Sequence, residues 1–252
     1  MTKRIFSPYE LNELRKWSKD VDPSTFGKKP IEYVTGHVEF AGLDFLVSDD
    51  TLIPRIESEK MVNIALRFVD DHNLAHPVIA DIGTGSGCLG ISLAVRLSKR
   101  KTPYTIFLSD ISPKALKVAD QNAQRLLHSP ENIFFQESNL FESFPKIKFD
   151  LILANLPYIP TKNIESLDPS VKDFEPKIAL DGGSKGNLYI NALLSRLPQF
   201  LAKGGHAPRI GGQAIFEIDD THTLSSFTVP KGLSTTIEND CFAKPRFLIV
   251  TL

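Results

Sequence analysis

From Pro77 onward, short apolar segments alternate with helical ones, and this alternation constrains the fold more than any other feature. The first apolar segment, residues 78–82, is followed by a glycine-rich loop and then by an apolar helix. Continuous apolar strands separated by helices are typical of a parallel sheet that is covered on both faces. The sequence therefore predicts an α/β fold with a doubly wound, mostly parallel, Rossmann-like sheet.

Seven segments have strand composition, so we expect a seven-stranded sheet. They are residues 78–82, 105–108, 133–135, 149–153, 214–218, 235–238 and 247–250. No helical pattern separates the last two, which should therefore pair antiparallel at one edge. Helices are expected after Pro54, from Ser112-Pro113, and over 187–201, with a kink at Pro198.

The first part of the chain is predicted to be a short helical segment followed by a β-hairpin. Ser7-Pro8-Tyr9-Glu10 has the serine cap, the first-turn proline and the glutamate of a capping box, and Pro23 should stop this helix. Residues 38–40 and 43–47 alternate around an Ala41-Gly42 turn, which predicts the hairpin. We therefore divide the chain into a helical segment (1–32), a hairpin linker (33–56) and a catalytic domain (57–252).

Composition excludes several classes of protein. The 29 basic and 30 acidic side chains give a net charge of −1, which argues against direct, non-specific nucleic-acid binding. Neither a membrane-spanning apolar run nor a secretory signal is visible, and Cys88 and Cys241 match no metal-ligand spacing. We expect a soluble cytoplasmic protein without a metal site or a membrane partner.

The loop after the first strand of the sheet predicts a ligand site. It reads Asp81-Ile82-Gly83-Thr84-Gly85-Ser86-Gly87. Ligands of open α/β sheets bind beyond the carboxyl ends of the strands, and glycines allow the backbone to come close to them. A plain tight turn is the alternative interpretation of this loop.

Asp110 ends the second strand, where an acidic residue commonly accepts hydrogen bonds from a ribose diol. The alternative role is a helix cap. Since Ser112 already supplies that cap, we favour the ribose role.

Asn155-Leu156-Pro157-Tyr158 ends the fourth strand and is the most informative stretch. The asparagine oxygen and the carbonyl of Leu156 can both accept hydrogen bonds from a planar NH₂ group. Pro157 keeps Leu156 extended and so fixes the direction of that carbonyl. An ordinary proline turn with a core tyrosine is the alternative, but the glycine loop and Asp110 favour an active site.

Five segments together resemble the release factor glutamine methyltransferases (the HemK/PrmC family) of the class I S-adenosylmethionine-dependent enzymes. They are IEYVTG (31–36), LIPRIESE (52–59), DIGTGSGC (81–88), NLPYI (155–159) and FEP (174–176). The chain resembles this family over nearly its whole length from Ile31 onward. The glycine-loop motif occurs in many methyltransferases, whereas the LIPR and FEP segments are much more specific.

The resemblance implies methyl transfer from S-adenosylmethionine to the side-chain nitrogen (N5) of the glutamine in the Gly-Gly-Gln loop of a peptide chain release factor. It implies a catalytic turn at Asn155, Leu156, Pro157 and Tyr158, with Tyr158 as a wall of the pocket. The cofactor-binding residues that it implies are Asp81, Gly83, Thr84, Gly85, Ser86, Gly87, Asp110, Asn139, Leu140 and Asn155.

Three features depart from the family pattern. Leu156 stands where the family has the first proline of NPPY, and Asn139 stands where an acidic residue usually follows the third strand. The region before the hairpin is also shorter than the family's helical N-terminal domain. Leu156 and Asn139 leave open a non-catalytic module that binds a nucleotide or a protein. An adenine N6 nucleic-acid methyltransferase is a second alternative, because such enzymes also use an Asn-Pro-Pro-aromatic motif, on a flipped base.

The chain also contains its own Gly211-Gly212-Gln213, the tripeptide of the expected substrate. The family places a Gly-Gly pair directly before the fifth strand, so we interpret these glycines as structural. We expect a surface loop near residues 205–212 and no methylation of Gln213.

Overall fold

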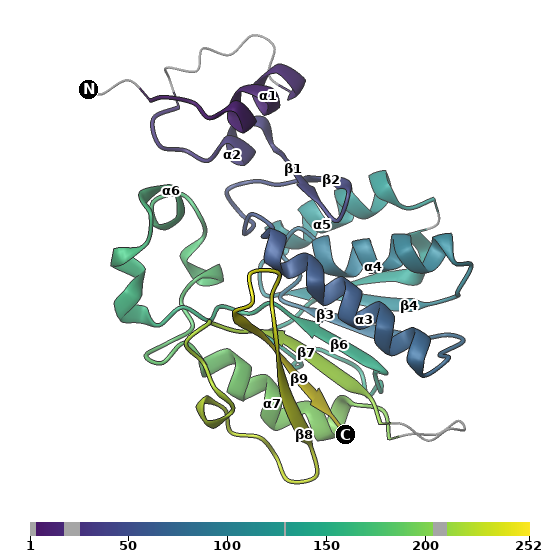
Figure 1. Cartoon of the computed structure of the whole chain (residues 1–252). Coiled ribbons are helices and arrows are strands. Elements are labelled where there is room, and N and C mark those ends of the chain that lie inside the picture. Colours follow the sequence, from purple (N-terminus) through teal and green to yellow (C-terminus); the bar gives the residue numbers. More distant parts are fainter. Residues whose placement is uncertain (1–3, 18–25, 129, 204–210) are drawn as a thin grey trace.

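The computed structural model describes residues 4–17, 26–128, 130–203 and 211–252. These residues form a seven-stranded sheet in the order β5-β4-β3-β6-β7-β9-β8 (Figure 1). The strands are β3 (Val78–Ile82), β4 (Thr105–Asp110), β5 (Ile133–Glu137), β6 (Leu151–Ala154), β7 (Gln213–Glu217), β8 (Ser234–Asn239) and β9 (Pro245–Thr251). Neighbours from β5 to β7 run parallel, and β9 pairs antiparallel with β7 and β8. The predicted doubly wound α/β sheet with an antiparallel edge pair is confirmed.

Helices cover both faces of this sheet. The α-helices of the described residues are α1 (Pro8–Trp17), α2 (Ile31–Thr35), α3 (Glu59–Asp71), α4 (Cys88–Lys99), α5 (Pro113–Leu126), α6 (Pro169–Lys172) and α7 (Leu188–Phe200). Short 3-10 helices are η2 (Ile56–Ser58), η3 (Pro130–Asn132), η4 (Thr161–Ser166), η5 (Lys177–Ala179) and η6 (Leu224–Ser226). Side chains of α3 and α4 pack on one face of the sheet, and those of α7 pack on the other.

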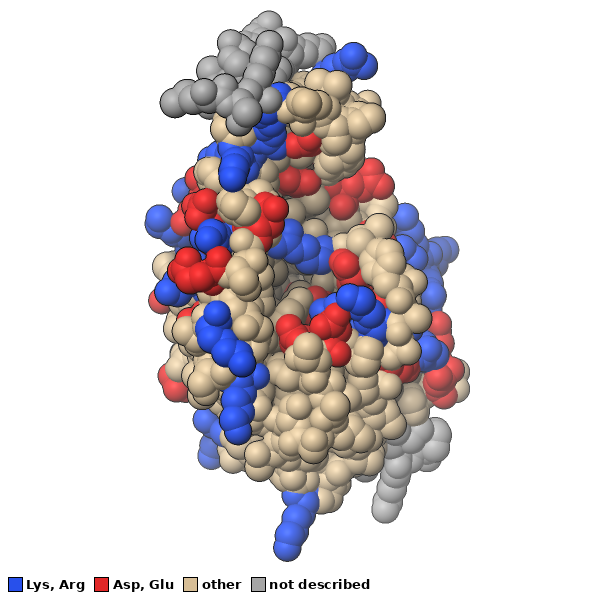
Figure 2. All heavy atoms as spheres, turned by 60° about the vertical axis from the view of Figure 1, so that its left-hand side comes forward, with Lys and Arg blue, Asp and Glu red and all other residues tan. Residues whose placement is uncertain are grey.

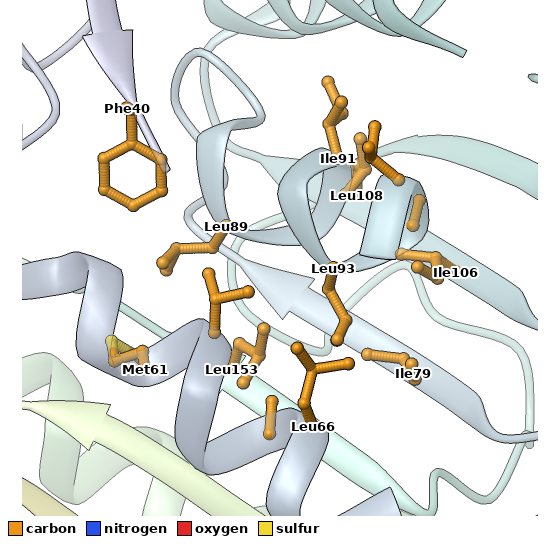
Figure 3. Packing of buried hydrophobic residues seen from close by; sticks show 14 of the residues in the cluster. Phe40, Met61, Leu66, Ile79, Leu89, Ile91, Leu93, Ile106, Leu108 and Leu153 are labelled. Atoms are coloured by element: carbon orange, nitrogen blue, oxygen red, sulfur yellow. The ribbon is translucent and has the colours of Figure 1, made fainter. Parts of the chain in front are cut away.

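Successive residues of each central strand contribute to two different cores, because side chains of a strand alternate between its faces. Ile79 packs with Leu66 and Leu93 on the α3–α4 face, whereas Ala80 belongs to the core under α7. Figure 3 shows the first core, in which Phe40 of the hairpin faces the residues of α3 and α4. Strands that are buried on both faces explain why the apolar runs in the sequence are continuous.

The N-terminal elements match the sequence prediction in part. The capping box of α1 is present: Glu10 N donates to Ser7 Oγ over 3.2 Å, and Ser7 N donates to a carboxylate oxygen of Glu10 over 2.7 Å. The hairpin consists of β1 (His37–Phe40) and β2 (Leu43–Leu46), joined by Ala41-Gly42. The expected stop at Pro23 lies outside the described residues.

The sequence did not predict α2, which spans the proposed boundary between residues 32 and 33. We keep the division into 1–32, 33–56 and 57–252 as a proposal. The prediction for Phe149 was wrong in detail. Phe149 lies before β6 and donates its N–H to the carbonyl of Phe200, so it joins the end of α7 rather than the strand ladder.

The hairpin is attached to the sheet domain by a buried asparagine of α5. Asn122 exchanges two hydrogen bonds with the backbone of Leu46, and its NH₂ group also donates to the carbonyl of Ser86 in the glycine loop over 2.9 Å. One side chain therefore connects the hairpin to the loop that follows β3.

Over the described ranges, no helix has the length and apolarity that a membrane span requires. The same residues contain no cluster of three or more His, Cys, Asp or Glu side chains that could hold a metal ion.

Candidate active site

A cavity opens at the carboxyl ends of β3, β4 and β6, where most of the predicted site residues meet; Asp81, Gly87 and Tyr158 do not line it. Its lining includes Gly83, Thr84, Gly85, Ser86, Asp110, Asn139, Leu140, Asn155, Leu156 and Pro157 from the predicted set. Segments 50–58, 111–115 and 176–189 supply further parts of the wall. The face turned forward in Figure 2 is hollowed, and both acidic and basic side chains surround the hollow.

The glycine loop needs its glycines for different reasons. Gly83, Gly85 and Gly87 all have positive φ, at 71°, 56° and 81°. A Cβ at Gly87 would lie 2.6 Å from Ile91 and one at Gly83 would lie 2.9 Å from the Leu156 side chain, whereas one at Gly85 would meet no atom within 4 Å. Gly85 is therefore the point at which the loop backbone faces open space beside the cavity.

Asp110 fixes this loop to the end of β4. Its Oδ2 accepts from Gly85 N and its Oδ1 accepts from Ser112 N, each over 2.9 Å, while Ser112 Oγ caps α5 by accepting from Ala115 N. Burial raises the pKa of Asp110, and the N–H groups of Ser112 and Gly85 oppose that shift. Ile111 follows Asp110, lines the cavity and leaves half of its surface exposed (50%).

Asp81 lies behind the loop and is not part of the cavity wall. It is fully buried, and its Oδ2 accepts from Thr84 Oγ1 over 2.7 Å and from Gly90 N over 3.0 Å. Burial raises the pKa of Asp81 to about 6. Its hydrogen bonds to Thr84 and Gly90 thus hold the glycine loop against the start of α4.

The turn after β6 contains two hydrogen-bond acceptors that no described residue uses, on two residues that line the cavity. Asn155 uses its NH₂ group internally, donating to Glu217 Oε2 over 3.0 Å and to Ser58 Oγ over 3.3 Å. Its Oδ1 and the carbonyl of Leu156 accept no hydrogen bond from any described residue. The Leu156 side chain is buried and packs against Gly83, so this turn directly adjoins the glycine loop.

Tyr158 takes a different place from the one expected. It is not among the described residues that line the cavity, and its hydroxyl donates to Glu217 Oε1 over 2.9 Å. Burial and the neighbouring carboxylate raise its pKa well above the usual value for tyrosine. The contact between Tyr158 and the site therefore runs through Glu217.

Asn139 and Leu140 border the opposite side of the cavity, beyond β5. The side-chain NH₂ of Asn139 donates to Glu142 over 3.1 Å. Leu140 has φ 51°, a left-handed conformation that is unfavourable for leucine and that turns the chain at this wall.

The segment after FEP closes the cavity from the side of α7. Glu175 is buried and pairs with Arg55, while Pro176, Ile178 and Ala179 line the wall. Gly182 and Gly186 let this segment approach the catalytic turn, because a Cβ on either would lie within 3 Å of backbone atoms of Pro157 or Tyr158. In Figure 1 this part of the chain stands beside the sheet, next to α6.

Gly211-Gly212-Gln213 lies at the other end of the sheet. Gln213 begins β7 and pairs with Leu151, whereas the site follows Ala154, which pairs with Phe216. A Cβ at Gly211 would lie 1.9 Å from the Leu252 carbonyl, and one at Gly212 would lie 2.7 Å from that of Phe149. These glycines permit close backbone packing, in keeping with a structural role. Gly212 is buried, so this end of the predicted surface loop (205–212) does not lie on the surface, and residues 205–210 lie outside the described residues.

Glu217, Ser58 and the two glycines at 182 and 186 were missed by sequence reasoning. Glu217 carried a usable signal, because it ends an apolar strand of the parallel sheet, as Asp110 does. The contribution of Ser58 had no such signal, since it depends on a hydrogen bond to Glu217, which lies 159 positions later in the sequence.

Comparison with known proteins first defines the class. Residues 75–178 match a family model described as "Methyltransferase domain". Among solved structures, a methyltransferase from Pyrococcus furiosus has a TM-score of 0.53 at 15% identity, covering 83% of this chain and 88% of that one. The hMettl16 catalytic domain has a TM-score of 0.59 at 13% identity, covering 99% and 92%. The described sheet and its helices thus have the Rossmann-like methyltransferase fold.

Closer relatives define the family. A release factor glutamine methyltransferase of Leptospira interrogans is 36% identical over 225 residues, 88% of this chain and 75% of the relative. One from Geobacter sulfurreducens is 40% identical over 71% of this chain and 59% of its own length, and one from Koribacter versatilis is 38% identical over 70% and 60%. The chain belongs to the release factor glutamine methyltransferase family. It spans about 60% of the length of the Geobacter and Koribacter relatives.

Proposed function

We propose that this chain binds S-adenosylmethionine and transfers its methyl group to N5 of the glutamine in the Gly-Gly-Gln loop of a peptide chain release factor. The observation that carries the proposal is the pair of free acceptors, Asn155 Oδ1 and the Leu156 carbonyl, beside the glycine loop. The two N–H groups of a primary amide match two such acceptors.

The cavity has the chemistry that a nucleoside cofactor requires. The Asp110 carboxylate suits a ribose diol, Ile111 and Leu140 supply apolar surface for a flat base, and Gly85 leaves room for close backbone approach. When bound, S-adenosylmethionine supplies an electrophilic methyl group on a sulfonium centre. Asp110 and the loop 83–87 are the residues that we expect to hold it.

An amide nitrogen is a weak nucleophile because its lone pair is delocalised, so orientation has to provide much of the rate. Good placement of two reacting groups is worth about 7–11 kcal/mol. Asn155 and Leu156 would hold the amide plane so that the nitrogen lone pair points at the methyl carbon. In this arrangement the substrate nitrogen would take the methyl group in exchange for the sulfur leaving group, and the amide proton would leave after transfer, so the two acceptors would need no strong base beside them.

The proposed partner is a protein, and the proposed location is the cytoplasm, where release factors act. Membership of the family supports the protein substrate. The near-zero net charge of the chain also favours a protein substrate over a nucleic acid.

The test is methyl incorporation from radiolabelled S-adenosylmethionine into purified release factor, compared with a release factor whose loop glutamine is replaced by alanine, and with adenine-containing DNA and RNA. Label on the unmodified release factor alone supports the proposal. Label on nucleic acid would favour the adenine methyltransferase, and cofactor binding without any transfer would favour the non-catalytic module.

A further inference from the structure

A buried carboxylate stands behind the catalytic turn. Glu217 ends β7, is 1% exposed and accepts hydrogen bonds from three side chains. Its Oε2 accepts from Asn155 Nδ2 (3.0 Å) and Ser58 Oγ (2.5 Å), and its Oε1 accepts from Tyr158 (2.9 Å). Both oxygens are therefore occupied by groups around the turn, and the carboxylate itself does not line the cavity.

This contact determines which end of the Asn155 amide faces the cavity. The two ends of an asparagine side chain have almost the same shape but opposite hydrogen-bonding character. With the NH₂ group on Glu217, the oxygen is directed away from the carboxylate and stays free. The flipped amide would place Oδ1 against a carboxylate oxygen, bringing two acceptors together, and would leave a donor where the substrate also offers donors.

We propose that Glu217 is a positioning residue that locks the Asn155 amide with its oxygen toward the substrate. The proposal rests on the proposed function for its catalytic consequence. Ser58 and Tyr158 hold the carboxylate from two sides, so the lock connects η2, the end of β7 and the turn after β6. Glu217 acts only through Asn155. Its loss should therefore lower kcat only when Asn155 is present, whereas the loss of a residue needed for folding would act in both backgrounds.

The first experiment compares two variants in the release-factor assay. Glu217→Met has a similar size but no acceptor, and we expect it to lower kcat by at least about 30-fold while the cofactor Kd changes by less than about threefold. Glu217→Gln can direct its own oxygen at the Asn155 NH₂, and we expect it to restore kcat to within about tenfold of wild type. A Met variant with wild-type kcat, or a Gln variant no better than Met, would overturn the proposal.

A double-mutant cycle tests whether the effect passes through Asn155. In the Asn155→Ala background, Glu217→Met should lower the residual kcat by less than about threefold, because the amide to be oriented is already gone. The same large loss in both backgrounds would show that Glu217 does not act through Asn155.

A third experiment tests the contact between Glu217 and Asn155 in the wild-type protein, so it does not depend on whether a Glu217 variant folds. The side-chain NH₂ signals of Asn155, identified by their loss in Asn155→Ala, should exchange with solvent at least about tenfold more slowly than those of the exposed Asn163. Equal exchange rates for the two side chains would show that Glu217 does not hold the Asn155 amide. If the wild type methylates no release factor, the proposed function has failed, and this exchange measurement still decides whether Glu217 holds the amide.

Discussion

Arg55 and Glu175 lie 120 positions apart in the sequence and form an ion pair with 2.5 Å between Nη2 and Oε1. Glu175 Oε2 also accepts from the N–H of Ile53 over 3.3 Å. Pro54 and Pro176, which adjoin these partners, both line the cavity. The pair thus joins the two segments that most specifically resemble the family, and it holds two walls of the site together.

We expect Arg55→Met to lower the free energy of unfolding by about 2–4 kcal/mol, because it leaves the buried Glu175 carboxylate without its cation. The segment around Pro176 should loosen, so cofactor affinity should fall as well. Urea denaturation followed by circular dichroism measures the first effect, and calorimetry measures the second.

The matched control is Arg67→Met, which removes the cation of an exposed pair with Glu238. Exposed pairs are typically worth less than about 1 kcal/mol, so this variant should change stability little. Equal losses in the two variants would show that the Arg55–Glu175 pair has no special structural role.

Asp110→Ala should bind S-adenosylmethionine about 10- to 100-fold more weakly, because it removes the predicted ribose acceptor and frees the N–H of Gly85. Titration calorimetry measures the affinity. Glu137→Ala is the control, since Glu137 pairs with Asp110 at the end of the adjacent strand, is exposed and does not line the cavity. Unchanged affinity in Asp110→Ala would rule out the ribose role.

Gly186→Ala should destabilise the protein by about 2–4 kcal/mol and displace the catalytic turn, because the new Cβ would lie 2.1 Å from the carbonyl oxygen of Tyr158. Gly232→Ala is the control: its φ is also positive, but an added Cβ meets no atom within 4 Å. The control should lose only the backbone strain, about 1–2 kcal/mol, and should keep its methyl-transfer rate. Equal effects in both variants would mean that the close approach to Tyr158 is unimportant.

The elements that the sequence predicted well are those determined by local pattern. The apolar runs identify the strands because both faces of β3 and β6 are buried, and Ser112 caps α5 through its own hydroxyl. The glycine loop, Asp110 and Asn155 were found because the carboxyl ends of parallel strands lie at one edge of the sheet.

The parts that were missed depend on contacts between distant segments. Nothing near Asn155 in the sequence shows that Ser58, almost a hundred positions earlier, shares a carboxylate with it. Tyr158 was expected at the cavity because its motif lies there, but its hydroxyl donates a hydrogen bond to Glu217 instead. Gly182 and Gly186 have a clear role only once the path of the catalytic turn is known.

Asp81 should make the cofactor-free protein less stable as the pH rises, whereas a salt-bridged carboxylate makes a protein more stable as the pH rises. Its pKa is raised from 3.8 to about 6 in the folded state, so between these values the folded protein binds more protons than the unfolded chain. Its contribution to the free energy of unfolding therefore falls as the pH rises through this window, by on the order of 2–3 kcal/mol.

Asp81→Asn should remove this dependence, since the amide oxygen can still accept from Thr84 and Gly90. The difference in stability between variant and wild type should grow in favour of the variant from pH 4 to pH 6.5 and then level off. Urea denaturation at several pH values measures it. A difference that does not vary with pH would contradict the raised pKa.

Asn155→Ala should be the most damaging single change to catalysis. It removes the acceptor for one N–H of the substrate amide, and loss of one oriented hydrogen bond in a closed site costs about 10²–10³ in rate. The stability loss should be modest, because Asn155 is only partly buried and Ser58 and Tyr158 still donate to Glu217. Cofactor affinity should be nearly unchanged because Asp110 and the glycine loop remain. Rates of methyl transfer to a release factor, with the exposed Asn163→Ala as control, measure the effect.

Leu156→Pro in the same assay should keep equal or higher activity, because it restores the family pattern and preserves the carbonyl acceptor. No described residue accepts a hydrogen bond from the Leu156 N–H, so replacing it with proline breaks no hydrogen bond to these residues. It does remove a buried side chain that packs against Gly83, for which we expect a stability loss of about 1 kcal/mol. Full activity in Asn155→Ala together with a large loss in Leu156→Pro would mean that the Leu156 side chain, and not the Asn155 oxygen, positions the substrate.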